Sequence, residues 1–242
     1  MELIDKDVIL KYEDRYIELP EELQKDIKKF WENVIKDNPN LFDGENFVIE
    51  SMHENENTIE LLAVKSHYSH YLYNERVGIQ EEKYRACSPW TGILLQTTDN
   101  YLVVGQMDKT TSKPDCLQIP GGQLDTSDIN GDKLDLIQNL KRELKEEINI
   151  DLDTIDYKFK YLEYSNIKRN VYGFIALGKI DKTKEELIIH FNEYKKYLLE
   201  NNLETEFEKL IFFKKENALN ELDKLPNPKR PYLRELLKVA MQ

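Results

Sequence analysis

The chain has few cysteines, no long apolar run and a deficit of basic side chains, and each absence excludes a class of protein. Cys87 and Cys116 are the only cysteines among 242 residues, so we expect no disulfide framework and a reducing compartment. The longest apolar stretches are far too short to span a bilayer. The first residues lack the basic and then apolar layout of a secretory signal. These absences predict a cytoplasmic protein with no membrane partner.

Acidic side chains outnumber basic ones by 46 to 34, which gives a formal net charge of −12. A negative surface repels phosphate backbones, so the sequence disfavours a nucleic-acid partner. The chain can nevertheless fill a core, because 40% of its residues are hydrophobic and it contains 14 Tyr, 9 Phe and 2 Trp. The length fits one large domain, or one domain with a smaller appendage.

Helical and strand patterns are mixed along the chain. Apolar residues at helical spacing follow Pro20 and stop at Asn38-Pro39, which predicts a first helix. Further helices are expected at about 134–148, at 189–201 and in two pieces at the C-terminus. Strands are expected at 47–49, 59–64, 90–97, 101–106, 158–164, 171–180 and 207–213. Helices combined with hairpin-linked strands predict an α+β protein built as a mixed sandwich.

The helix expected at 134–148 has an apolar stripe and an acidic arc. At 100° per residue, one face carries Leu134, Ile137, Leu140, Leu144 and Ile148, which we expect to pack on the core. Away from this stripe stand Glu143, Glu146 and Glu147, at positions i, i+3 and i+4, where like charges destabilise an exposed helix by about 0.2–0.5 kcal/mol per pair. Two interpretations are open: a solvated acidic face, or a carboxylate cage for a hard cation such as Mg²⁺ or Mn²⁺.

The surroundings of the acidic arc favour the cation cage. Pro120-Gly121-Gly122 lets the backbone turn sharply, so that main-chain carbonyls can approach a metal or a phosphate. Asn149 stands where a left-handed helix cap is expected. Gly122 with residues 142–150, Arg-Glu-Leu-Lys-Glu-Glu-Ile-Asn-Ile, resembles the signature box of Nudix hydrolases. That box is a Gly, five residues, a Glu, seven residues, then Arg-Glu-aliphatic-x-Glu-Glu-x-Gly-aliphatic, and the resemblance implies a Nudix-like α/β/α sandwich with a mixed sheet.

The box departs from the family pattern in its spacing and at its last Gly, which is Asn149 here. Nineteen residues separate Gly122 from Arg142, six more than in the pattern, and we expect the extra residues in a hydrophilic loop at 126–133. The first Glu of the pattern has no counterpart at its usual spacing. Three acids are candidates to replace it, and the sequence does not choose among them: Asp125, Asp128 and Asp132.

The resemblance implies hydrolysis of a nucleoside diphosphate linked to another group. Mg²⁺ or Mn²⁺ would activate a water that attacks one phosphorus, and the implied ligands are Glu143, Glu146, Glu147 and the backbone carbonyl of Gly122. Glu146 and Glu147 would therefore be catalytic. Arg142 is expected to brace the box by ion pairing. In the family the general base often lies in a late loop before the last strand, where Glu206 is the candidate and an ordinary surface acid is the alternative.

The first 85 residues resemble the leader of UDP-glucose pyrophosphatases of the Nudix type. The shared features are a Trp-bearing helix, an Asn-Pro-x-Leu-Phe turn and a Tyr-x-x-aromatic-Leu segment, here at Trp31, 38–42 and 68–72. This implies a helix-plus-strands subdomain at 1–85 before a Nudix domain at 86–242. It also implies a UDP-sugar substrate, split into UMP and a sugar 1-phosphate. Aromatic side chains would then contact the base, namely Phe42, Tyr68 and Tyr71, unless they only pack the leader onto the core.

Other readings of the same resemblance are open. ADP-ribose or another dinucleoside pyrophosphate is an alternative substrate, and a leader of this kind is compatible with a homodimer. A catalytically dead Nudix-like nucleotide sensor is a third reading, against which the intact Glu143, Glu146 and Glu147 argue. Lys229-Arg230 is a possible contact for phosphate, although solvated surface charges are the preferred interpretation.

Overall fold

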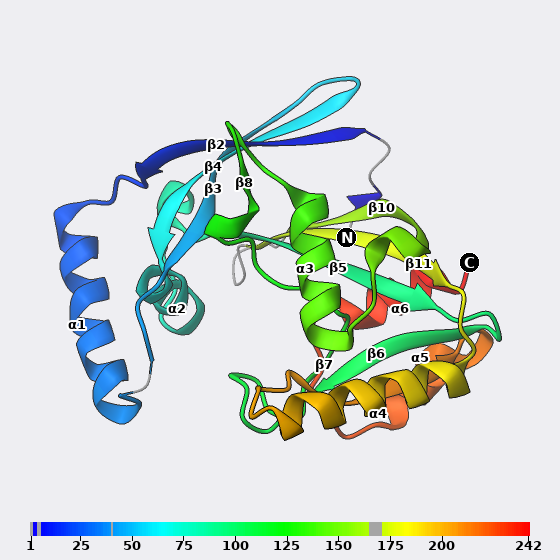
Figure 1. The fold of residues 1–242 in the computed structure, drawn as a ribbon. Coiled ribbons are helices and arrows are strands. Elements are labelled where there is room, and N and C mark those ends of the chain that lie inside the picture. Colours follow the sequence, from blue (N-terminus) through cyan, green and yellow to red (C-terminus); the bar gives the residue numbers. More distant parts are fainter. Residues whose placement is uncertain (1, 4–5, 40, 165–170) are drawn as a thin grey trace.

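The computed structural model describes residues 2–3, 6–39, 41–164 and 171–242, which form two β-sheets flanked by helices (Figure 1). The larger sheet has seven strands within these residues. In spatial order they are β1 (Glu2–Leu3), β10 (Ile155–Tyr164), β11 (Val171–Ile180), β5 (Ser88–Gln96), β6 (Tyr101–Met107) and β12 (Phe207–Lys214), with β7 (Leu117–Gln118) beside β6. Strands β11 and β5 are parallel and the other neighbours antiparallel, so the sheet is mixed.

Helices cover both faces of the larger sheet, which confirms the predicted α/β/α sandwich and α+β class. Successive residues of a strand point to opposite faces, and β5 shows this clearly. Ile93 and Leu95 pack with α3 (Leu136–Ile148) and α4 (Lys184–Glu200), whereas Leu94 packs with α5 (Ala218–Lys224) and α6 (Leu233–Ala240). The four expected helical segments of this region are therefore present, and none of the described helices is long and apolar enough to cross a membrane.

The smaller sheet combines the first third of the chain with the middle of the Nudix-like box. Its order is β3 (Glu45–Glu54), β4 (Thr58–His67), β2 (Asp7–Tyr16), β9 (Lys133–Leu134) and β8 (Ile129–Asn130). Helices α1 (Glu21–Asp37) and α2 (Tyr68–Arg76) contact each other beside it, and Figure 1 shows them at the same end of the molecule. Short 3₁₀ turns complete the chain: η1 (Glu82–Tyr84), η2 (Thr126–Asp128), η3 (Leu152–Thr154) and η4 (Lys215–Asn217).

Strands from each side of the expected boundary at residue 85 pair with strands from the other side. Strand β1 pairs with β10 of the larger sheet, and the β8–β9 hairpin joins β2 of the smaller one through Lys11 and Lys133. A core cluster between the sheets contains residues from both sides of the boundary, among them Leu61 and Phe174. The division into 1–85 and 86–242 remains a prediction about domains, because the two regions share strands and a core.

Three local expectations were wrong. Residues 126–133 form a 3₁₀ turn and most of a hairpin instead of a loop. The box helix begins at Leu136 and not at 134, because Leu134 belongs to β9 and Asp135 caps the helix. Ile137 lies off the buried stripe, with 46% of its surface exposed, whereas Leu136 beside it packs against the core. Strand β2 and helix α2 were not predicted.

Candidate active site

A cavity of about 400 Å³ lies where the box, the Gly-Gly turn and α2 meet. Its lining includes Gly121, Gly122 and Glu143 from the box region and Glu206 from the segment before β12. Residues of α2 and of the C-terminal segment also line it. The volume lies in the range of small-molecule sites, and carboxylates and aromatic rings share the wall. The fold therefore brings box residues and residues of the N-terminal region to one space.

The ends of α3 explain why these residues form a helix here. Asp135 caps the N-terminus, because its Oδ1 accepts hydrogen bonds from the backbone N–H groups of Ile137 and Gln138 at 3.0 Å each. Asn149 ends the helix in the left-handed conformation, with φ of 54°, as predicted. Because both ends of α3 are fixed, Glu143 and Glu147 are held facing the Gly121–Gly122 turn.

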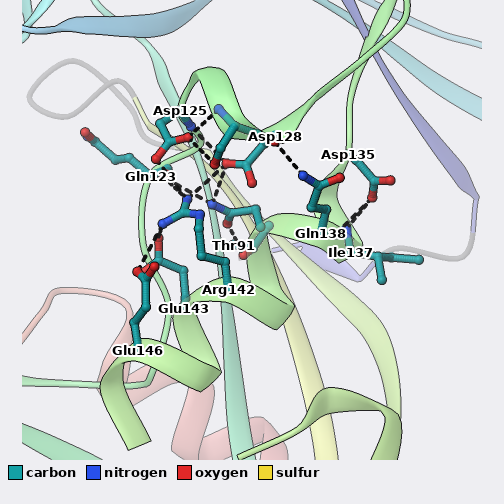
Figure 2. A network of polar contacts seen from close by, with 12 residues as sticks. Thr91, Gln123, Asp125, Asp128, Asp135, Ile137, Gln138, Arg142, Glu143 and Glu146 are labelled. Atoms are coloured by element: carbon teal, nitrogen blue, oxygen red, sulfur yellow. Dashed lines mark hydrogen bonds and ion pairs between the residues drawn. The ribbon is translucent and has the colours of Figure 1, made fainter. Parts of the chain in front are cut away.

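Arg142 makes the ion pairs expected of it (Figure 2). Its Nη1 lies 2.9 Å from Oε1 of Glu143 and 3.4 Å from Oε2 of Glu146, and its Nη2 lies 3.0 Å from Oδ2 of Asp128. Burial alone would lower the pKa of Arg142, but the hydrogen bond to Asp128 and the charge of Glu143 raise it above its ordinary value. The guanidinium therefore stays charged and links the helix to the turn before it.

Asp128 occupies the position of the missing Glu. Its side chain is fully buried, and Oδ2 accepts hydrogen bonds from the backbone N–H of Asp125 (2.9 Å) and from Nδ2 of Asn139 (3.0 Å), in addition to Arg142. Asp125 caps the 3₁₀ turn and reaches Arg142 only at 3.4 Å, while Asp132 is exposed in the hairpin turn. The usual spacing from Gly122 is thus kept up to Asp128, and the six extra residues, 129–134, form the β8–β9 hairpin.

Four carboxylates lie close enough to influence one another. Burial, with the charges of Glu206 and Glu146, raises the pKa of Glu143 to about 7 despite Arg142. Burial and the charges of Glu206 and Glu143 raise the pKa of Glu147 well above its ordinary value. The pKa of Glu206 is also raised, chiefly because neighbouring groups partly desolvate its carboxylate, although the residue as a whole is exposed. Glu146 is the outermost, with 56% of its side chain exposed. Such crowding of acids is relieved either by protons or by a cation.

The residues present fit a hard divalent cation in three respects. In the described part of the chain, no N–H or O–H group donates to the buried Oε1 of Glu147, while Oε2 accepts from the N–H of Gly121 at 2.7 Å. A Cβ on Gly122 would lie 2.5 Å from the carboxylate of Glu143, so only Gly leaves that carboxylate its place. The atoms that Glu143, Glu147 and Gly122 offer to a cation are all oxygen atoms, the ligands that Mg²⁺ prefers.

Two further observations concern the geometry of this donor set. The carbonyl of Gly122 accepts a hydrogen bond from the N–H of Thr91 at 3.0 Å, which leaves its second lone pair for a ligand. Among the described residues, no three His, Cys, Asp or Glu side chains are already arranged as a metal cage. Glu143 and Glu146 both contact Arg142, so a cation would require them to turn.

The structure separates the three aromatic residues predicted to bind substrate. Tyr68 and Tyr71 line the cavity, with ring centroids 6.0 Å apart and planes at 28°. Tyr68 also contacts Trp31 of α1 edge-on, so it contributes to packing as well. Phe42 is 82% exposed and does not line the cavity, so we drop it from the set.

The sequence analysis did not single out Trp90 and Tyr232, and it preferred a surface role for Arg230. Trp90 and Tyr232 lie 142 positions apart in the chain, and they stack with ring centroids 5.1 Å apart. No spacing in the sequence connects them. Arg230 also lines the cavity, although a solvated surface charge was the preferred interpretation. Its proximity to a buried aromatic two positions later was the available signal.

Several solved structures are similar in fold to this chain. DR0079 from Deinococcus radiodurans matches with a TM-score of 0.46 and 15% identity, over 64% of this chain and 83% of that one. A NUDIX hydrolase from Alicyclobacillus acidocaldarius gives 0.45 and 11%, over 64% and 91%. A C. elegans Ap4A hydrolase in a binary complex gives 0.40 and 17%, over 62% and 93%. No family model and no curated protein matches the sequence. With TM-scores below 0.5, these likenesses do not decide the family.

Proposed function

We propose that the chain is a metal-dependent pyrophosphohydrolase of the Nudix type. The observation that carries the proposal is the crowding of Glu143, Glu147 and Glu206 near the Gly121–Gly122 turn, where Glu143 and Glu206 line a cavity. A structural acidic face would be solvated and would show no such burial. Here Glu143 is 7% and Glu147 only 2% exposed, and a buried acid without a counter-charge is unfavourable.

Glu143, Glu146, Glu147 and the carbonyl of Gly122 would hold Mg²⁺, with Mn²⁺ as the alternative. When bound, such a cation neutralises phosphate oxygens and lowers the pKa of a bound water. Glu206 is the proposed general base, which accepts a proton as water attacks one phosphorus and the P–O–P bond breaks. The raised pKa of Glu206 supports this role, because a carboxylate with a raised pKa accepts a proton more readily than an ordinary one.

A nucleoside diphosphate sugar is the proposed substrate, with a UDP-sugar giving UMP and a sugar 1-phosphate. The stacked pair Tyr68 and Tyr71 lines the same cavity as Glu143 and Glu206, which supports a ligand that combines a flat base with a diphosphate. The net charge of −12 suits such a small ligand in the cytoplasm better than a nucleic acid. A homodimer is compatible with the proposal and is not required by it.

A substrate panel with Mg²⁺ or Mn²⁺ tests the proposal. Nucleotide sugars of different bases, ADP-ribose, NADH and diadenosine polyphosphates are incubated with the protein, and release of mononucleotide is measured. Release of UMP from a UDP-sugar alone is the expected result. Cleavage of ADP-ribose but not of UDP-sugars would reject the substrate while keeping the reaction, and nucleotide binding without any turnover would favour a sensor.

Two variants and one control make the panel specific to the carboxylates. Glu147→Gln and Glu206→Gln keep the side-chain shape and remove the charge, and both are expected to lower turnover by at least about 100-fold. Glu32→Gln, an exposed acid on α1, is the matched control and should behave as the parent. Equal activity in Glu147→Gln and Glu32→Gln would refute the proposed metal site.

A further inference from the structure

The C-terminal segment before α6 places one arginine in the cavity wall in a defined position. The N–H of Arg230 donates to the carbonyl of Leu117 at 3.0 Å, and the N–H of Leu117 donates to the carbonyl of Pro228 at 2.8 Å. The carbonyl of Arg230 accepts from the N–H of Leu233 at 3.0 Å. Arg230 is thus anchored on both sides, next to β7 and two residues before the buried Tyr232.

Arg230 is half-buried, and its side chain has no hydrogen-bond or ion-pair partner among the described residues. The other arginine of the cavity lining, Arg76, is exposed to solvent, and the lysines near Arg230 have partners. Lys113 is 2.8 Å from Glu75, and the ammonium of Lys229 donates to carbonyls of its own loop at 2.6 and 3.0 Å. An arginine held in a partly desolvated wall without an anion loses hydration without compensation, unless a ligand supplies the anion.

We propose that Arg230 binds the diphosphate of the ligand directly, from the side of the cavity formed by the C-terminal segment. The inference rests on the proposed function for the identity of the anion. The five N–H donors of a guanidinium match two phosphate oxygens at once, and Arg230 shares its cavity with Glu143 and Glu206, which repel phosphate unless a cation lies between. Arg230 therefore supplies a fixed positive charge that does not depend on the metal.

Titration with UDP in the presence of Mg²⁺ tests this assignment, with Arg230→Ala, Arg230→Lys and the control Arg234→Ala. Arg234 is an exposed arginine on α6 that pairs with Asp223 outside the cavity. Arg230→Ala should weaken UDP binding roughly 10- to 100-fold, as expected for a charged hydrogen-bonding group. Arg230→Lys should recover part of the lost affinity, because lysine restores the positive charge but not the planar guanidinium that can bind two phosphate oxygens at once. Arg234→Ala should bind as the parent.

Thermal midpoints separate binding from folding. Because the side chain of Arg230 bonds to none of the residues that the structure describes, Arg230→Ala should melt as the parent does, and a matching fall in midpoint would show a structural role instead. Unchanged UDP affinity in Arg230→Ala would overturn the assignment, and so would a parent protein that binds neither UDP nor pyrophosphate. If no substrate of the panel is cleaved but UDP binding still depends on Arg230, the proposed hydrolysis fails and the anion site stands.

Discussion

Replacing Asp128 with Ala removes the acceptor on which three donors converge. Arg142 Nη2, Asn139 Nδ2 and the N–H of Asp125 all donate to its Oδ2. Asn139 and Arg142 also point at the carbonyl of Gln123, at 3.1 and 3.5 Å, so neither is left entirely without an acceptor. The N–H of Asp125 loses the only side-chain acceptor that it has.

The expected loss of stability follows from the burial of this pair. Removing one partner of a buried ion pair destabilises a protein by about 3–5 kcal/mol. Arg142 keeps Glu143 and Glu146 as partners and is 23% exposed, so we expect the lower limit, about 3 kcal/mol. At roughly 2–4 °C per kcal/mol for a chain of this size, the thermal midpoint should fall by about 6–12 °C.

Thermal unfolding followed by circular dichroism measures this loss, and Asp132→Ala is the matched control. Asp132 was an equal candidate from the sequence, but its side chain is exposed and only its backbone carbonyl bonds to the N–H of Tyr12. Asp132→Ala should therefore change the midpoint little. If Asp128→Ala and Asp132→Ala melt at the same temperature, Asp128 does not hold Arg142 as argued.

Three other perturbations have defined outcomes. Gly121→Ala should destabilise by about 1–3 kcal/mol in urea unfolding, since φ is +139° and the new Cβ would lie 2.1 Å from the carbonyl oxygen of Thr91. Mg²⁺ at about 100 times its dissociation constant should raise the free energy of unfolding by about 2.7 kcal/mol, which raises the thermal midpoint by about 5–10 °C. Glu147→Gln should abolish this increase. Burial lowers the pKa of His70 below 6.5. Its contribution to stability is therefore complete above pH 6.5 and is lost as the pH falls through the lowered pKa. His70→Gln should flatten that part of a plot of unfolding free energy against pH.

Each of these has a control in the same chain. Gly78 also has a positive φ, of +90°, but nothing lies within 4 Å of a Cβ there, so Gly78→Ala separates backbone strain from collision. Glu32→Gln should keep the full response to Mg²⁺. His53 is exposed, and His53→Gln should leave the pH profile of the parent intact. A Gly121→Ala as stable as Gly78→Ala, or a Mg²⁺ response that survives in Glu147→Gln, would contradict the geometry described above.

Most strands and helices were predictable because their signals are local. Pro20 and Asn38-Pro39 bound α1, and the short apolar runs of β5, β6 and β12 stand between turn residues. Strand β2 was missed because charged residues interrupt it and only Leu10 is fully buried along it. Helix α2 was missed because its aromatic residues at 68–73 show no helical stripe; they face α1 on one side and the cavity on the other.

The candidate site was predictable along the box and not across the chain. Glu143, Glu147 and Gly122 were found from the resemblance of one helix and one turn to the Nudix box, and Glu206 from the place that the resemblance implies for a general base. Trp90 and Tyr232 were missed, and Arg230 was given a surface role, because their proximity to the site depends on how α6 packs on the sheet. The loss of Phe42 from the set has the same cause, because a turn that resembles a binding motif can still face solvent.

The six extra residues decide how the N-terminal third relates to the site. Asp128, which holds Arg142, and Asp135, which caps α3, stand at the two ends of the β8–β9 hairpin, and the N–H of Asp135 donates to the carbonyl of Asp128 at 2.8 Å. The same hairpin pairs with β2, where the N–H of Tyr12 donates to the carbonyl of Asp132 at 2.8 Å. The β8–β9 hairpin therefore leaves the ion pair between Asp128 and Arg142 in place and ties the start of α3 to the smaller sheet. Had these six residues displaced Asp128, Arg142 would have lost its fully buried partner and kept partners whose side chains are more exposed.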